Sequence, residues 1–136
     1  MPETYSAVYS ATKYALRGFS LTLNIELKRH NIFVGTVFPD SIDTPMLTYE
    51  ATHDGSPLTF LSKPQSPDAV ARAVLKTVSS HKVETYVPPF SATLPKMITC
   101  IPGILPPLWR LLEKAGEKKK QKYLARAGIS TEGEKA

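Results

Sequence analysis

The feature that most constrains the fold is a short apolar run, residues 32–38, that follows a long segment of helical periodicity. The run is rich in branched and aromatic residues and stops at Pro39, which is typical of a buried parallel strand. In the preceding segment apolar residues recur every three or four positions, so we predict a helix from about Ala7 to Arg29 that ends at His30-Asn31. The recurring residues are Leu16, Phe19, Leu23 and Leu27. A helix followed by a buried strand predicts an α/β fold.

A second helix and a second strand are predicted further along the chain. Ser66-Pro67-Asp68 offers a helix N-cap, a first-turn proline and an acid that interacts favourably with the helix dipole, so we predict a helix through about Ser80. The apolar side of this helix carries Val70, Val74 and Val78. Residues 83–87 then predict a short strand stopped by Pro88-Pro89. With the first strand, these elements form a strand–helix–strand unit that we expect to be right-handed, with parallel strands.

The segment between these elements, residues 47–65, is predicted to be an irregular excursion because it contains Gly55, Pro57 and Pro64. Its apolar side chains either cover a substrate pocket or pack as an ordinary loop. These side chains are Leu47, Tyr49, Leu58, Phe60 and Leu61.

The last third of the chain differs in composition. Residues 97–109 carry no charge, but prolines interrupt them and they are too short to span a membrane; a basic cluster follows. We predict that residues 91–127 form an apolar and then basic helical tail, and that residues 128–136, which are small and polar, are disordered. The apolar residues, Trp109 and the lysines of 118–122 suit a membrane interface, whereas packing over a substrate pocket or against another subunit is an alternative.

Charge and composition narrow the function classes. The net charge of +5 and the pI near 9.4 come largely from the basic tail, which a solvated helix face explains better than a nucleic-acid site, so we expect no nucleic-acid partner. Cys100, the single cysteine, is expected to be an inert buried thiol. The three histidines lack metal-ligand spacing, so we expect no metal. We see no signal peptide and expect a cytoplasmic protein, with peripheral membrane contact through the tail as a further option.

Tyr9 and Lys13 are the residues with the clearest chemical potential. They stand four positions apart in the predicted first helix, so both side chains lie on one helix face. A lysine ammonium beside a phenol stabilises the phenolate, and a tyrosine in that setting can serve as a general acid or base near neutral pH. A bare Tyr-x-x-x-Lys is common by chance, so the residues around it decide its meaning.

The segment Tyr9-Ser10-Ala11-Thr12-Lys13-Tyr14-Ala15-Leu16-Arg17-Gly18 resembles the active-site helix of the short-chain dehydrogenases/reductases, in which small residues follow Tyr-x-x-x-Lys. The resemblance continues beyond the apolar run. There, Pro39-Asp40-Ser41-Ile42-Asp43-Thr44 is similar to the family's Pro-Gly-x-x-x-Thr cofactor loop, with Asp40 in the glycine position. The resemblance implies that residues 1–90 form the carboxyl-terminal half of the family's domain, which is a doubly wound Rossmann-type parallel sheet.

The same resemblance implies the site residues. Tyr9 would be the catalytic acid or base in ketone/alcohol interconversion, and Lys13 would assist it and bind the nicotinamide ribose of NAD or NADP. Pro39, Ile42 and Thr44 match the positions that contact the nicotinamide carboxamide. An aspartate reaches the positive φ open to glycine only at an energetic cost, so Asp40 leaves the backbone shape of this loop open.

A dinucleotide site also needs closely spaced glycines to bind the pyrophosphate, and no such turn can be drawn from the seven glycines of this chain. The first hypothesis is therefore a truncated oxidoreductase, inactive without an amino-terminal half and acting on a hydrophobic carbonyl or alcohol. The second is a non-enzymatic remnant that acts as an interaction or peripheral membrane module. In either case we expect an exposed apolar helix face and strand edge, and hence self-association or a homo-oligomer.

Overall fold

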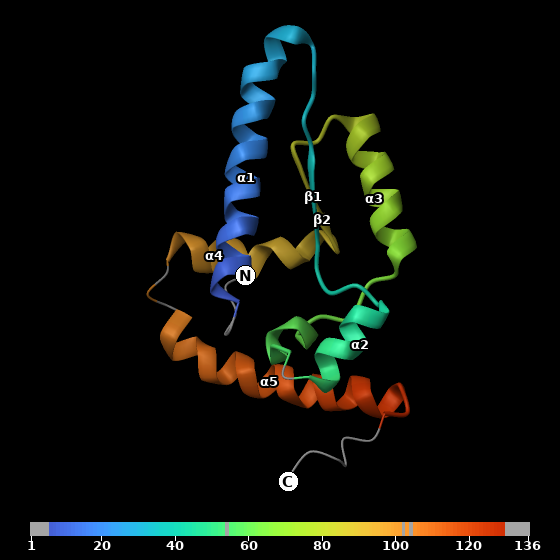
Figure 1. Cartoon of the computed structure of the whole chain (residues 1–136). Coiled ribbons are helices and arrows are strands. Elements are labelled where there is room, and N and C mark those ends of the chain that lie inside the picture. Colours follow the sequence, from blue (N-terminus) through green and yellow to red (C-terminus); the bar gives the residue numbers. More distant parts are fainter. Residues whose placement is uncertain (1–5, 54, 102, 104, 130–136) are drawn as a thin grey trace.

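Helices flank a small parallel sheet in the computed structural model, and a second set of helices packs beyond the sheet (Figure 1). The structure describes residues 6–53, 55–101, 103 and 105–129. In chain order the elements are α1 (Ala7–Leu27), the 3-10 helix η1 (Lys28–His30), β1 (Thr36–Pro39), α2 (Pro45–Thr52), the 3-10 helix η2 (Pro57–Phe60), α3 (Pro67–Ser80), β2 (Glu84–Val87), the 3-10 helix η3 (Pro89–Ala92), α4 (Thr93–Cys100) and α5 (Leu105–Arg126).

The first helix ends where the sequence predicts. After η1, Asn31 adopts a left-handed conformation with φ 58° and ψ 28°, and its backbone N–H donates to the Lys28 carbonyl at 3.0 Å. Asparagine tolerates this conformation better than most residues. No residue of α1 is buried, and Leu16 and Phe19 of the predicted apolar stripe are exposed. The helix therefore shows an uncovered apolar face, as expected from its sequence.

The two strands lie side by side and parallel, as predicted. Thr36 pairs with Glu84, and the register continues through Phe38 opposite Tyr86. The first strand is shorter than the predicted run 32–38, however, because the backbone amides before Thr36 have partners in α1. Ile32 N–H donates to the Leu27 carbonyl at 3.3 Å, and Val34 N–H donates to Asn24 Oδ1 at 3.0 Å. Residues 32–35 are thus a connection fastened to the helix, and the ladder begins later.

The helix α3 begins at the predicted N-cap. Ser66 Oγ accepts a hydrogen bond from Ala69 N–H at 3.2 Å, with Pro67 as the first helical residue. The apolar side of α3 is not its buried side, because Val74 and Val78 are exposed. Thr77 is buried instead, and its hydroxyl bonds the Ala73 carbonyl and Thr85 Oγ1, each at 2.7 Å. The side of α3 that meets the sheet is therefore the side carrying Thr77.

Most of the buried apolar core lies where α5 packs against α2 and η2 (Figure 1). The core cluster consists of Leu47, Ala51, Phe60 and Leu124, with Tyr123 and Ile129 packed against it. The predicted irregular excursion over 47–65 is therefore wrong in part, since this segment contains a helix and a 3-10 helix. Thr44 caps α2, and Ser56 caps η2, which explains why both elements form despite the nearby glycine and prolines.

The tail segment forms α4 and α5. Cys100, the last residue of α4, is exposed, so the expectation of a buried thiol was wrong. The prediction of disorder over 128–136 falls mainly on residues 130–136, which lie outside the described residues. Within the described part of the chain, no helix combines the length and the apolar character needed to cross a membrane.

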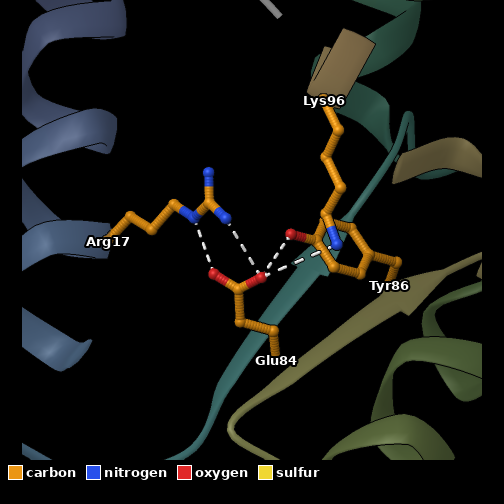
Figure 2. Close-up of polar contacts among 4 residues, drawn as sticks. All are labelled: Arg17, Glu84, Tyr86 and Lys96. Carbon is orange, nitrogen blue, oxygen red and sulfur yellow. Dashed lines mark hydrogen bonds and ion pairs between the residues drawn. The ribbon is translucent and has the colours of Figure 1, made fainter. Parts of the chain in front are cut away.

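Arg17 of α1 and Glu84, the first residue of β2, form a two-point ion pair (Figure 2). Arg17 Nε donates to Glu84 Oε1 at 2.6 Å, and Nη2 donates to Oε2 at 3.1 Å. Tyr86 Oη donates to the same Oε2 at 2.7 Å, and Lys96 Nζ of α4 lies 4.0 Å from it. Two parallel N–H bonds fix the orientation of a carboxylate. We call these four residues the Glu84 clamp, and they join α1, β2 and α4.

An aromatic pair supports the Glu84 clamp. The rings of Phe38 and Tyr86, which are partners in the strand register, stack with centroids 5.0 Å apart. The Arg17 guanidinium lies 5.9 Å from the Phe38 ring centroid, and Lys96 Nζ lies 4.5 Å from the Tyr86 ring centroid. Each cation is thus attracted both to Glu84 and to a ring face.

The Glu84 clamp shifts the pKa of its members. The hydrogen bond from Arg17 lowers the pKa of Glu84, in spite of opposing burial, and the same bond raises the pKa of Arg17. Burial, followed by the hydrogen bond to Glu84, raises the pKa of Tyr86 to about 12. At neutral pH the clamp therefore contains an ionised carboxylate, a protonated guanidinium and a neutral phenol that donates its proton.

The first prediction concerns the clamp and pH. A lowered pKa in the folded state means that Glu84 stabilises the fold above its ordinary value of 4.5, and that this contribution is lost as the pH falls through the folded value. Tyr86 contributes below its ordinary value of 10.0, and this contribution is lost as the pH rises toward 12. We expect Glu84→Gln to lower the free energy of unfolding at pH 7 by about 1–3 kcal/mol, measured by urea denaturation.

Glu26→Gln is the matched control, because Glu26 is an exposed carboxylate on α1, the helix that carries Arg17. We expect it to change the free energy of unfolding by less than about 0.5 kcal/mol. The difference between the wild type and Glu84→Gln should also shrink as the pH falls below the usual carboxyl range. An equal effect of the two substitutions at pH 7 would contradict the assigned role of the clamp.

The second prediction concerns the contact between α5 and η2. A Cβ added at Gly116 would lie 2.3 Å from the Pro57 carbonyl oxygen, whereas one added at Gly18 of α1 would meet nothing within 4 Å. Alanine favours a helix over glycine by up to about 1 kcal/mol, but overpacking costs about 1–3 kcal/mol. Gly18→Ala should therefore raise the melting temperature and Gly116→Ala should lower it. Equal shifts in calorimetry would show that α5 does not pack on η2 this closely.

Candidate active site on the first helix

Tyr9 and Lys13 lie together on the first two turns of α1. Lys13 Nζ is 5.1 Å from the centroid of the Tyr9 ring, so the ammonium sits over the aromatic face. The predicted helix spacing therefore does bring the two side chains together. Tyr9 is 63% exposed, which leaves its hydroxyl accessible to a ligand.

The Glu84 clamp fixes the position of α1 along the strand direction of the sheet. The chain runs along α1 and β1 in opposite directions (Figure 1). Tyr9 lies eight residues before Arg17 in the chain, a distance of about 12 Å along the helix axis. Val87 ends β2 three residues beyond Glu84, about 10 Å along the strand in the same direction. Because these displacements nearly match, Tyr9 is level with the carboxyl ends of the strands, where ligands bind in open α/β sheets.

The loop after β1 carries the other predicted site residues. Pro39 is the last residue of β1, and Ile42 forms an isolated parallel bridge with Gln65. Asp40 N–H donates to the Val87 carbonyl at 2.8 Å, and Asp40 Oδ1 accepts from Ser41 N–H at 3.0 Å. The loop is therefore held to β2 and to the start of α3 at this edge of the sheet.

Asp40 does not adopt the conformation that a glycine would favour. Among the described residues, the non-glycine positions with positive φ are Asn31 and His81. Asp40 thus fits the loop without the strain that a positive φ would bring, and its carboxylate is used locally as the acceptor for Ser41.

Thr44 lies at the end of this loop with a weakly engaged hydroxyl. Its Oγ1 donates to the Ile42 carbonyl at 3.3 Å and accepts from Leu47 N–H at 3.4 Å, both long for hydrogen bonds. A shallow hollow in the surface is lined by Asp43, Thr44, Pro45 and Thr48. The neighbouring Ser41 Oγ is buried, and among the buried side chains that the structure describes it is the polar atom without a hydrogen-bond partner.

The residues that hold α1 in place were not predicted from the sequence. Arg17 continues the four-residue steps from Tyr9 to Lys13, which was a signal that it shares their helix face. Its partner Glu84 lies 67 positions away, and no local pattern points to that pairing. A metal site is not indicated, since the described part of the chain contains no group of three or more His, Cys, Asp or Glu residues placed to hold an ion.

Comparison with known proteins agrees with these motifs. A family model described as short chain dehydrogenase matches residues 1–55, which include Tyr9, Lys13 and the loop that follows β1. The chain is 28% identical over 122 residues to dehydrogenase/reductase SDR family member 7B of Xenopus laevis, an alignment that covers 87% of this chain and 37% of the frog protein.

Two further relatives are named as reductases. Over 71 residues, which are 50% of this chain and 21% of each relative, the identity is 32% to 3-ketodihydrosphingosine reductase of Bos taurus and 34% to 3-dehydrosphinganine reductase of Danio rerio. The chain thus spans 37% of the length of the frog relative and 21% of the length of the bovine relative. No solved structure matches it. The family model, these relatives and the paired motifs around β1 support an assignment to the short-chain dehydrogenase/reductase family.

Proposed function

We propose that this chain carries the proton-transfer half of an NAD(P)-dependent oxidoreductase that interconverts a ketone and an alcohol. The observation that supports this most is the Lys13 ammonium over the Tyr9 ring, at the level of the strand ends. The resemblance to the family supplies the reaction class. The Glu84 clamp explains why this pair is level with the carboxyl ends of the strands.

The residues present fit the nicotinamide end of such a cofactor. Lys13 is a cationic donor suited to ribose hydroxyls, and Thr44 has a hydroxyl whose present hydrogen bonds are long enough to be exchanged for a ligand amide. Pro39 and Ile42 fix the backbone on either side of the unpaired Ser41 hydroxyl. When bound, the nicotinamide would supply or accept the hydride.

Tyr9 has the role of general acid or base. During reduction, Tyr9 Oη donates its proton to the carbonyl oxygen of the substrate, and during oxidation it accepts the proton of the alcohol. Lys13 stabilises the phenolate that is left after proton donation, because a cation beside the ring lowers the energy of the negative charge. The exposure of Tyr9 allows a substrate oxygen to approach within hydrogen-bond distance.

The substrate we propose is a hydrophobic ketone or alcohol, of the long-chain lipid type. Two of the relatives are named as reductases of sphingoid ketones, and the third is named only as a family member. Exposed apolar side chains also occur on the first turn of α1 and in η3 and α4, as with Val8, Phe90 and Met97. Such side chains favour a substrate with a large apolar part.

The third prediction separates proton transfer from cofactor binding. In an enzyme that joins this chain to a glycine-rich dinucleotide-binding half, Tyr9→Phe should lower kcat by at least about 100-fold while leaving the cofactor affinity unchanged. Lys13→Ala should weaken cofactor binding as well as turnover, because Lys13 has both roles. Steady-state kinetics and cofactor fluorescence titrations measure the two effects.

Tyr49→Phe is the matched control for this experiment. Tyr49 is 62% exposed, almost the same as Tyr9, but lies on α2 and stacks on His53. Loss of the Tyr49 hydroxyl should leave kcat within about twofold of the wild-type value. If Tyr9→Phe retained wild-type turnover, Tyr9 would have no part in the mechanism.

The fourth prediction concerns the chain by itself. No pair of its glycines is spaced as a pyrophosphate-binding turn requires, so we propose that turnover needs a separate dinucleotide-binding half. Titration of NADH or NADPH into the chain should give no fluorescence change at micromolar cofactor. Saturable binding in that range would show that these residues alone form a complete cofactor site.

A second candidate function is that of a non-enzymatic interaction module. It is favoured by the uncovered apolar face of α1, on which Leu16 and Phe19 are exposed. A face of this kind suits self-association into a homo-oligomer or contact with another protein. Turnover by the joined enzyme of the third prediction would decide for the oxidoreductase.

A further inference from the structure

One side of α5 is committed to the protein core. Gly116 packs closely against Pro57, and Leu124 is buried in the core cluster. The ammonium of Lys119 donates to the Leu61 carbonyl, and Lys120 Nζ donates to the Gly55 carbonyl at 3.2 Å. These contacts fix the rotation of α5 about its axis, and so they determine which of its side chains face outward.

The outward side of α5 carries a basic stripe. Lys114, Lys118 and Lys122 recur every four residues, are exposed, and extend the line that begins with Leu111. Residues 105–126 contain seven basic and two acidic side chains, which matches the net charge of +5 of the whole chain. The charges of the rest of the chain therefore cancel, and the positive excess of the protein lies on this one helix.

An exposed apolar corner adjoins the basic stripe. It lies at the junction of α4 and α5, where Ile101, Pro106, Pro107 and Leu111 are all exposed, and Leu111 is 65% exposed. In Figure 1 this junction lies at one end of α5, away from the core that α5 forms with α2. Apolar surface beside a row of lysines combines the two contributions to peripheral membrane binding, which are burial of apolar area and attraction to anionic lipids.

We propose that the apolar corner and the basic stripe form a docking surface for a membrane that contains anionic lipids. Leu111 and Ile101 insert among the acyl chains near the headgroups, while Lys114, Lys118 and Lys122 contact the anionic headgroups. Charge complementarity selects this partner over a neutral bilayer. A nucleic acid would use the lysines but would leave the apolar corner without a role. The proposal does not depend on the oxidoreductase activity.

The test uses the full chain and lipid vesicles in a flotation assay. Phosphatidylcholine vesicles with and without about one third phosphatidylserine are compared at low and high salt. The chain should float with the anionic vesicles and remain unbound with the neutral ones, and 1 M salt should weaken its binding because the Debye length falls to about 3 Å.

Two pairs of variants separate charge from apolar insertion. Neutralising the stripe with K114Q/K118Q/K122Q should weaken binding on the order of 100-fold, given about 1 kcal/mol for each lysine near an anionic surface. The control K63Q/K76Q/K82Q removes the same charge at exposed sites elsewhere and should bind nearly as the wild type does. Ile101→Gln with Leu111→Gln should weaken binding about tenfold. Its control is Leu75→Gln with Val78→Gln, at exposed apolar sites on α3.

Several outcomes would overturn the proposal. Equal losses in the stripe variant and its control would mean that the net charge alone matters. Undiminished binding after the apolar substitutions would show that the apolar corner is not part of the interface. Binding to a DNA or RNA oligomer without flotation on anionic vesicles would assign the lysines to nucleic acid. Circular dichroism and melting curves of each variant confirm that a loss of binding is not a loss of folding.

Discussion

The ion pair between Arg17 and Glu84 is the interaction on which the geometry of the candidate site depends. It connects the middle of α1 to the first residue of β2 by two hydrogen bonds, and Tyr86 and Lys96 complete the environment of the carboxylate. No apolar residue of α1 is buried, so packing alone holds this helix weakly. A directional, charge-assisted contact therefore determines how far along the sheet the helix sits. The partial burial of Glu84 protects that contact from solvent screening.

Local features of the fold and the site could be predicted, and features that depend on distant partners could not. The one-turn spacing of Tyr9 and Lys13 and the cap at Ser66 each involve neighbours in the chain. The start of β1 was missed because Val34 N–H donates to the side chain of Asn24 and so does not join the sheet. The periodicity of the sequence does not reveal this contact. The buried face of α3 was missed because two short strands cover only the side with Thr77. Arg17 and Glu84 are 67 positions apart in the chain, so no local pattern predicts their pairing.

The buried core and the candidate site occupy different parts of the molecule. The core lies among α2, η2 and α5, and it adjoins the loop after β1, whose last residue Thr44 caps α2. Tyr123 of α5 contacts that loop, since its hydroxyl lies 3.3 Å from Asp43 Oδ1 and 3.1 Å from Thr48 Oγ1. The tail helix thus supports the loop that faces the nicotinamide in the proposed reaction. Changes on the inner side of α5 would be transmitted to this loop, while its outer side is free to bind a surface.

A helix that is held near its middle can tilt about that point, so its ends move the most. Arg17 is the point at which α1 is held, and Tyr9 lies about 12 Å from it toward the amino-terminal end of the helix. A tilt of only about 5° about Arg17 would displace the phenol by about 1 Å, and a misplacement of that size can cost about 100-fold in rate. Whatever rests against the amino-terminal turns of α1 can therefore tune the alignment of the phenol without touching it.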